Sequence, residues 1–191
     1  MDLIRLIESY RPTCEQEEAD RSEMLRRLRL GEELLFRTNA SAHFTASAWV
    51  TDASRSKVLM CYHRIYDSWA WLGGHADGND DLLQVALKEV REESGLTSIT
   101  PVSPDPKSLE ILTVNGHMKH GAYVSSHVHL NLSFIIEADP TEPLTVKADE
   151  NAGLAWYDPD AALEASSEPY FRQWVYPKLN RRLEALRTGR A

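Results

Sequence analysis

Residues 74–96, GHADGNDDLLQVALKEVREESGL, join a glycine-rich turn to an amphipathic segment that stops at a second glycine. Apolar residues recur at the spacing of one helical face, and Gly95 can end a helix in the left-handed conformation. Asn79 or Asp77 can cap the start of the helix. The stretch therefore predicts a tight turn followed by one strong helix, from about Asp80 to Ser94.

The second half of this helix carries three acids at positions i, i+3 and i+4, namely Glu89, Glu92 and Glu93. Side chains at these spacings share one helical face, so their carboxylates repel one another unless a cation lies between them. Crowded oxygen ligands suit a hard divalent ion, Mg²⁺ or Mn²⁺. Acidic runs on helices are more often solvated faces, but here glycines flank the run on both sides. We therefore expect a metal site on this face.

Strand-like runs flank the helix on both sides. The predicted strands are residues 43–51, 57–63, 109–114, 127–137 and 153–157, with a flexible loop over residues 115–126. The predicted helices are one or two within residues 2–36, broken near Arg11-Pro12, and two more near residues 159–165 and after Pro169. This order predicts an α+β fold with helices packed on a mixed sheet. We expect an N-terminal helical extension over residues 1–40 and a main domain over residues 41–191.

Composition excludes several classes of function. The net charge of -8 disfavours non-specific binding of nucleic acid, because an acidic surface repels phosphate backbones. The chain lacks the run of roughly 20 apolar residues that a membrane span needs, and its start does not resemble a signal peptide. Cys14 and Cys61 form no CxxC pair, which argues against a disulfide framework or a cysteine-based zinc site. We expect reduced thiols in a cytoplasmic protein.

Residues 74–96 resemble the signature of the Nudix hydrolase family. The family pattern is Gly, five residues, Glu, seven residues, Arg-Glu, an aliphatic residue, any residue, Glu-Glu, any residue, Gly and an aliphatic residue. The chain departs from it at Asp80, where the family has Glu, and at Lys88, where the family has Arg. A looser resemblance runs from about His43 to Tyr157. It implies a Nudix-like α/β/α sandwich with a mixed β-sheet.

The resemblance also implies a chemistry. Nudix hydrolases cleave a diphosphate linkage in a nucleotide-like small molecule, with Mg²⁺ or Mn²⁺ activating the attacking water. Carried onto this chain, the resemblance implies that Glu89, Glu92 and Glu93 bind the metal. The candidate catalytic residues are Glu93, Glu150 and Lys88. Lys88 would brace these acids, and either Glu93 or the loop acid Glu150 would orient the water as general base. Alternatively, Glu150 only decorates a turn.

Residues beside the glycine turn are candidates for contact with a substrate. His75 follows the double glycine, and Trp71 precedes it and can border a pocket or pack in the core. His127 and His129 are two apart, so on a strand they face the same side and can serve a metal or a phosphate, although satisfied polar groups are commoner. The candidate substrate-binding residues are Gly74, His75, Trp71 and His127. The C-terminal segment has a basic face, which is a solvated surface or the interface of a homodimer and consists of Arg172, Lys178, Arg181 and Arg182.

Two other functions remain open from the sequence. A non-catalytic Nudix domain that senses a nucleotide usually loses the helix acids, which this chain keeps. The isomerase branch of the same fold acts on isopentenyl diphosphate and has a Cys directly before a Gly-His pair. Here Gly73 stands at that position, before Gly74-His75, and Cys61 lies well upstream.

Overall fold

The computed structural model describes residues 3–64, 67–119, 121–146 and 151–189. Its helices and strands follow the chain in the order α1 (Leu3–Ser9), α2 (Glu15–Arg29), β1 (Ala42–Thr51), β2 (Val58–His63), β3 (Ser68–Ala70), β4 (Leu72–His75), α3 (Leu82–Ser94), β5 (Ile99–Pro101), β6 (Ser108–Val114), β7 (His117–Lys119), β8 (Ala122–Val124), β9 (His127–Ala138), β10 (Asn151–Tyr157), α4 (Pro159–Ala165), the π-helical turn η1 (Phe171–Val175) and α5 (Tyr176–Arg187).

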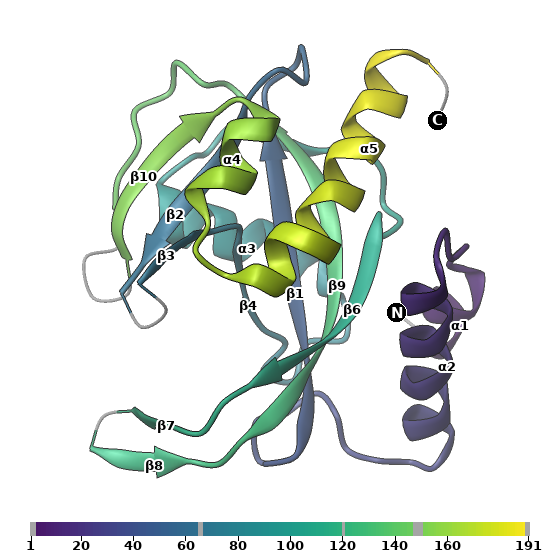
Figure 1. Ribbon diagram of the computed structural model, residues 1–191. Coiled ribbons are helices and arrows are strands. Elements are labelled where there is room, and N and C mark those ends of the chain that lie inside the picture. The colour runs from purple at the N-terminus through teal and green to yellow at the C-terminus, as the bar shows by residue number, and fades with distance from the viewer. Residues whose placement is uncertain (1–2, 65–66, 120, 147–150, 190–191) are drawn as a thin grey trace.

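The main sheet is mixed and curled (Figure 1). Strands β10, β2, β1, β9 and β5 lie in that order, with β3 beside β2, β4 beside β1 and β6 beside β9. Strand β1 pairs with β9 in parallel over the whole length of β1, from the pair Ala42 and Val128 to the pair Thr51 and Glu137. The other pairings in this sheet are antiparallel. The sheet therefore brings β1, β4 and β9 side by side, although the chain separates them.

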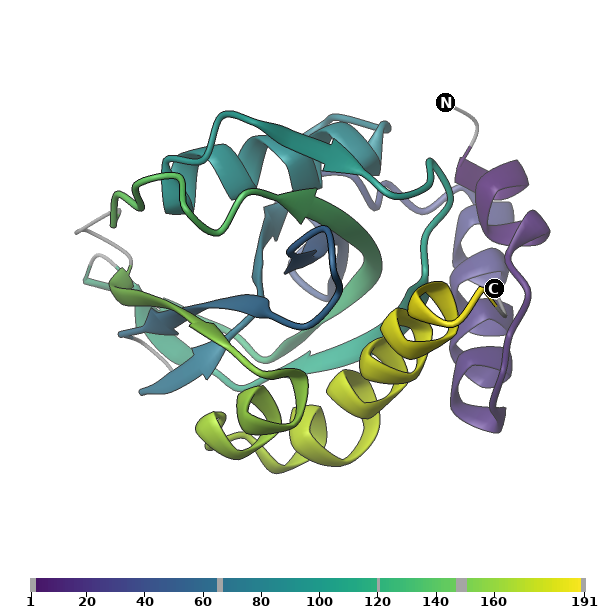
Figure 2. The same ribbon diagram turned by 90° about the horizontal axis from the view of Figure 1, so that it is seen from above.

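Helices cover both faces of the sheet. Alternate residues of β1, such as Phe44 and Ala46, face a core that also holds the apolar face of α3. The other alternate residues of β1 face the opposite side of the sheet, where Trp49 stacks on Tyr176 of α5. Figure 2 shows α3 on one side of the sheet, and α4 and α5 on the other. The predicted α+β fold, with the layers of an α/β/α sandwich, is therefore confirmed.

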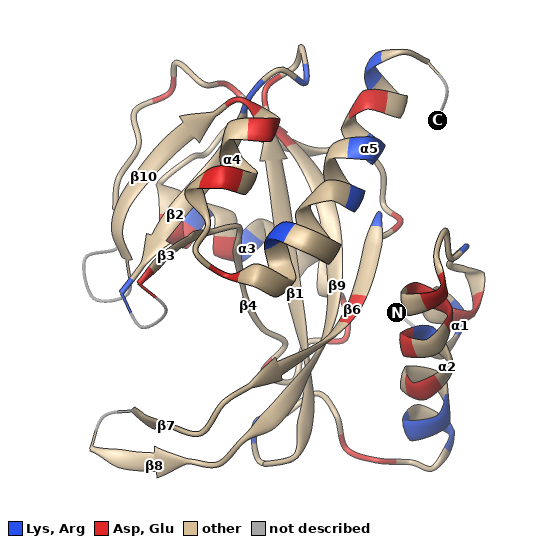
Figure 3. Ribbon diagram, viewed as in Figure 1, with Lys and Arg blue, Asp and Glu red and all other residues tan. Residues whose placement is uncertain are grey.

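The N-terminal helices pack beside this sandwich and cover the outer edge of β6. The side chain of Gln16 donates to the carbonyl oxygen of Leu109 (3.2 Å), and Asp20 accepts from the backbone N–H of Ile111 (2.9 Å). These bonds satisfy backbone groups that an exposed edge strand would offer to another chain. Figure 3 shows acids at the start of α2 and arginines at its end, the arrangement that the helix dipole favours. The proposed domain boundary near residue 40 stays a prediction.

One expectation about the fold is wrong. Residues 115–126, expected to be a flexible loop, contain the antiparallel hairpin of β7 and β8, which extends from the ends of β6 and β9 (Figure 1). Gly121, directly before β8, has φ 80°, a conformation that glycine adopts without strain. None of the helices in the described residues is long and apolar enough to cross a membrane.

Candidate active site

Both ends of α3 are defined by capping residues. Asp81 is the N-cap, and its carboxylate accepts a hydrogen bond from the backbone N–H of Gln84 (3.2 Å). The expectation that Asn79 or Asp77 caps the helix is therefore wrong, and Asn79 instead accepts from the backbone N–H of Asp81 (2.9 Å). Gly95 ends the helix with φ 75°, as the sequence predicts. These caps define where α3, the helix that carries the acidic face, begins and ends.

Glu89, Glu92 and Glu93 lie in the last turns of α3, the end at which the helix dipole is negative. The dipole therefore adds to the mutual repulsion of the carboxylates. The helix is held in place by apolar side chains that are buried against the sheet, and Glu93 is buried beside them. Packing against the sheet therefore holds the three glutamates on this helix against their mutual repulsion.

Strand β4 contacts α3 through Gly73 and Gly74. The backbone N–H of Gly73 donates to a carboxylate oxygen of Glu93 at 2.9 Å. A Cβ added to Gly74 would lie 2.5 Å from the carboxyl carbon of Glu89. Gly74 therefore leaves room for the side chain of Glu89, while a Cβ added to Gly73 would meet the backbone of β1 at Ala46 and Ser47.

Lys88 supplies positive charge to the acidic face. Its ammonium nitrogen lies 3.0 Å from an oxygen of Glu92 and 3.3 Å from an oxygen of Glu89. The hydrogen bond to Glu92, with the nearby charge of Glu89, raises the pKa of Lys88. Lys88 therefore stays protonated at neutral pH and bridges the two carboxylates. The bracing role expected at this position, where the family has Arg, fits these contacts.

Glu93 differs from its two neighbours because it is almost completely buried, with 2% of its surface exposed. Its second oxygen accepts a hydrogen bond from the side-chain amide of Asn151 (3.1 Å), the first residue of β10. Sequence reasoning missed Asn151, although it directly follows the candidate base Glu150. Glu150 itself lies outside the described residues, so its role as general base stays a prediction.

The predicted substrate-binding residues lie in three different places. Gly74 contacts the acid face. His75 and His127 belong to a cluster of histidines at one end of β1, β4 and β9. Trp71 is buried against Tyr176 and Phe171, which are the contacts of a packing residue. The structure therefore brings Gly74 to the acids and places Trp71 in the core, while the substrate contacts of all four residues stay predictions.

The buried thiol of Cys61 bears on the isomerase alternative. Cys61 lies in β2, and its sulfur donates to the backbone carbonyl of Trp71 at 3.4 Å. The position directly before Gly74-His75 is Gly73, whose backbone contacts Glu93. The described residues therefore place no thiol at the position that the isomerase branch uses.

The family model for the NUDIX domain matches residues 42–177 of the chain. The chain belongs to the Nudix family. No curated protein is similar enough in sequence to count as a match. Nudix hydrolases act on pyrophosphate bonds in small nucleotide-like molecules, and they generally use divalent metal ions.

Solved structures share the fold at low sequence identity. An Ap4A hydrolase from C. elegans, in a binary complex, has a TM-score of 0.52 at 14% identity, over 74% of this chain and 98% of that one. The dihydroneopterin triphosphate pyrophosphohydrolase of E. coli has a TM-score of 0.52 at 17% identity, over 73% of this chain and 95% of that one. These likenesses concern the fold.

Proposed function

We propose that this Nudix protein hydrolyses a diphosphate linkage of a nucleotide-like small molecule, with Mg²⁺ or Mn²⁺ held by Glu89, Glu92 and Glu93. The observation that carries the proposal is the position of the Lys88 ammonium group, which lies within 3.3 Å of both Glu89 and Glu92. The acidic face already binds one cation from its own helix, so its carboxylates are arranged to share positive charge.

The residues present fit a hard divalent ion. The ligand atoms are carboxylate oxygens, which Mg²⁺ and Mn²⁺ prefer. The side chain of Glu89 is 13% exposed and that of Glu92 42% exposed, so the face is open to solvent on the side of Glu92. Each carboxylate oxygen has two lone pairs, so Glu93 can accept from Gly73 and Asn151 and still bind a metal.

A divalent ion bound there supplies charge neutralisation of the diphosphate and a lower pKa for the attacking water. The chain's own residues supply the geometry. The hydrogen bonds from Gly73 and Asn151 hold both oxygens of Glu93 in fixed directions. Glu93 therefore suits a positioning role, while proton transfer from the water falls to Glu93 or to Glu150. Lys88 contacts Glu89 and Glu92, and we propose that it braces these two carboxylates.

The test is a hydrolysis screen with and without Mg²⁺ across ADP-ribose, nucleoside triphosphates, nucleotide sugars, dinucleoside polyphosphates and non-nucleotide diphosphates. We expect Mg²⁺-dependent phosphate release, after phosphatase treatment where needed, for at least one class. Tight binding of a nucleotide without turnover would instead favour the sensor function. Interconversion of isopentenyl diphosphate and its isomer would favour the isomerase.

The matched variants are Glu92→Gln/Glu93→Gln in the acidic face and Glu33→Gln as control. Glu33 is an exposed acid well separated in sequence from α3. We expect turnover to be lost in the double variant and kept in the control. Glu150→Gln separates the two candidate bases, because near-normal kcat in that variant would leave Glu93 as the base.

A further inference from the structure

Histidines from three strands meet on the side of the sheet away from α3. His43 of β1 and His129 of β9 are register partners on parallel strands, so their side chains project to the same face. His75 of β4 is the register partner of Thr45, two residues along β1 from His43. An added Cβ on Gly74 would point at Glu89, so strand alternation directs His75 away from the acid helix.

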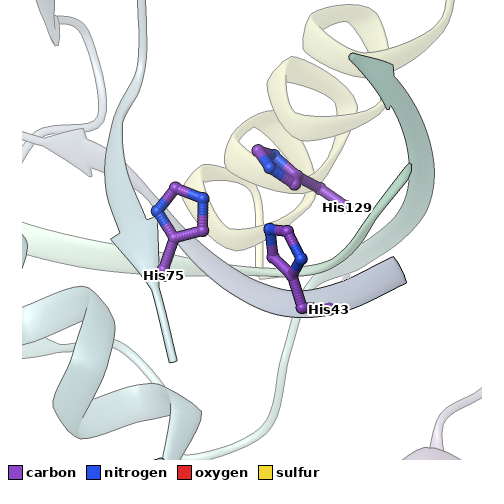
Figure 4. A group of neighbouring side chains, drawn as sticks. All are labelled: His43, His75 and His129. Atoms are coloured by element: carbon purple, nitrogen blue, oxygen red, sulfur yellow. The ribbon is translucent and has the colours of Figure 1, made fainter. Parts of the chain in front are cut away.

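The three rings converge (Figure 4). One ring nitrogen from each of His43, His75 and His129 lies within 4.8 Å of the other two. The ring centroids are 4.9 to 5.1 Å apart. We propose that these three histidines bind Zn²⁺ at a site separate from the acidic face, with His127 as the fourth ligand. Small rotations of the side chains bring such nitrogens to the separation in a tetrahedral zinc site, about 3.3 Å.

The orientation of His43 supports this assignment. Its Nδ1 lies 3.1 Å from the backbone carbonyl of Asn39, so Nδ1 carries the proton and donates, and Nε2 keeps its lone pair. His43 is 4% exposed, and its Nε2 atom is buried without a hydrogen-bond partner. Buried polar atoms are rarely left unpaired, and a metal ligand whose other nitrogen donates to a carbonyl is a common arrangement.

His127 stands where a fourth ligand is needed. Its Nδ1 lies 2.8 Å from the backbone carbonyl of Ser125, which leaves Nε2 as an acceptor. That Nε2 atom is 3.2 Å from Nε2 of His129. Two nitrogens bound to one tetrahedral zinc ion are about 3.3 Å apart, so this pair already has the required separation. Zinc would take the place of the proton that the two nitrogens otherwise share.

The chemistry of the ligands selects the metal. Imidazole nitrogen suits Zn²⁺ and neighbouring transition metals, whereas Mg²⁺ prefers oxygen. Four protein ligands leave no open position, so the site is structural and ties β1, β4 and β9 together. This inference does not depend on the proposed hydrolase activity.

The test is zinc binding to the full chain after treatment with a chelator. We expect calorimetry to detect one Zn²⁺ per chain, Zn²⁺ to raise Tm, and Co²⁺ to give the absorption spectrum of a tetrahedral site. His129→Gln and His75→Gln should weaken binding at least about tenfold, a loss comparable to that for disturbed metal sites elsewhere. His63→Gln, a half-buried histidine of β2 outside the cluster, should bind zinc like the wild type.

Glu89→Gln/Glu92→Gln separates the two sites. This variant should keep zinc binding, and its loss would place the ion on the acidic face and overturn the proposal. Unchanged affinity in both histidine variants would also overturn it. If a histidine variant fails to fold, the wild type alone still tests the proposal. The absence of stoichiometric zinc binding in the wild type would show that the histidines form a metal-free cluster.

Discussion

The acidic face of α3 and the histidine cluster are neighbours along β4, yet they offer different ligand atoms and differ in their exposure to solvent. The acidic face offers oxygen atoms from one helix, and the side chain of Glu92 is 42% exposed. The histidine cluster offers nitrogen atoms from three strands, and His43 is 4% exposed. An open oxygen site suits a metal that meets a substrate, and a closed nitrogen site suits a metal that holds strands together. On the two proposals, the acidic face is the reactive part of the molecule and the histidine cluster is a part that stabilises it.

The largest loss of hydrolytic activity should come from removing the acids of α3. Glu89→Gln/Glu92→Gln should lower kcat/KM by about a thousandfold, ~4 kcal/mol of barrier, because the diphosphate charge is then not neutralised. The measurement is steady-state hydrolysis of the best substrate from the screen. His129→Gln, tested at equal folded concentration, should change kcat/KM far less. Equal losses in the two variants would remove the distinction between a reactive and a structural region.

Stability should depend on different forces on the two sides of the sheet. On the histidine side, the buried amide of Asn131 accepts from Thr45 and Ser47 and donates to Glu110, with distances of 2.9 to 3.2 Å. Asn131→Leu should therefore lower the free energy of unfolding by about 2–3 kcal/mol, since Glu110 loses a donor while fully buried. Urea denaturation measures the change.

The matched control lies on the other face, next along the same strand. Leu132 is buried in the core that α3 covers, and Leu132→Met keeps its volume. This variant should cost less than about 1.5 kcal/mol. If it destabilised the protein more than Asn131→Leu, packing rather than polar pairing would dominate on both sides.

Gly74→Ala should disturb the acidic face without unfolding the chain. The new Cβ would meet the flexible end of Glu89 at 2.5 Å and push its carboxylate aside. A displacement of this size should lower kcat about tenfold, with little change in Tm. Gly153→Ala is the control, because its Cβ would meet Trp69 at 3.4 Å, an ordinary contact. The control should keep both kcat and Tm.

The smallest loss of hydrolytic activity should come from substituting Lys88. Its side chain is 61% exposed, and exposed ion pairs contribute about 0–1 kcal/mol. Lys88→Met should therefore lower kcat/KM less than about tenfold. Lys88→Arg restores the residue of the family pattern and can bind carboxylate or phosphate in a bidentate manner. A loss in Lys88→Met as large as that of the acid variant would make Lys88 a catalytic residue rather than a brace.

Sequence alone predicts the acidic region better than the histidine region, for a physical reason. Glu89, Glu92 and Glu93 are brought together by the pitch of one helix, which the spacing and Gly95 define. The same local reasoning places the long strands and the mixed sheet. The histidines come together only through the parallel pairing of β1 with β9, and the sequence does not contain that register.

The lack of information on strand pairing in the sequence also explains the other contacts that were not predicted. Strand alternation pairs His127 with His129, but nothing local shows that His43 lies beside them. Asn151 reaches Glu93 only because β10 pairs with β2. The hairpin of β7 and β8 was missed because its strands are short and lack an alternating pattern. Contacts between distant segments require the sheet topology.

The most direct test of the central claim is a titration with Mn²⁺ followed by electron paramagnetic resonance, which reports the free ion. We expect saturable binding in the wild type and in His129→Gln, and its loss in Glu89→Gln/Glu92→Gln. Wild-type affinity in the acid variant, or no saturable binding in the wild type, would contradict the claim that these carboxylates are arranged for a divalent cation.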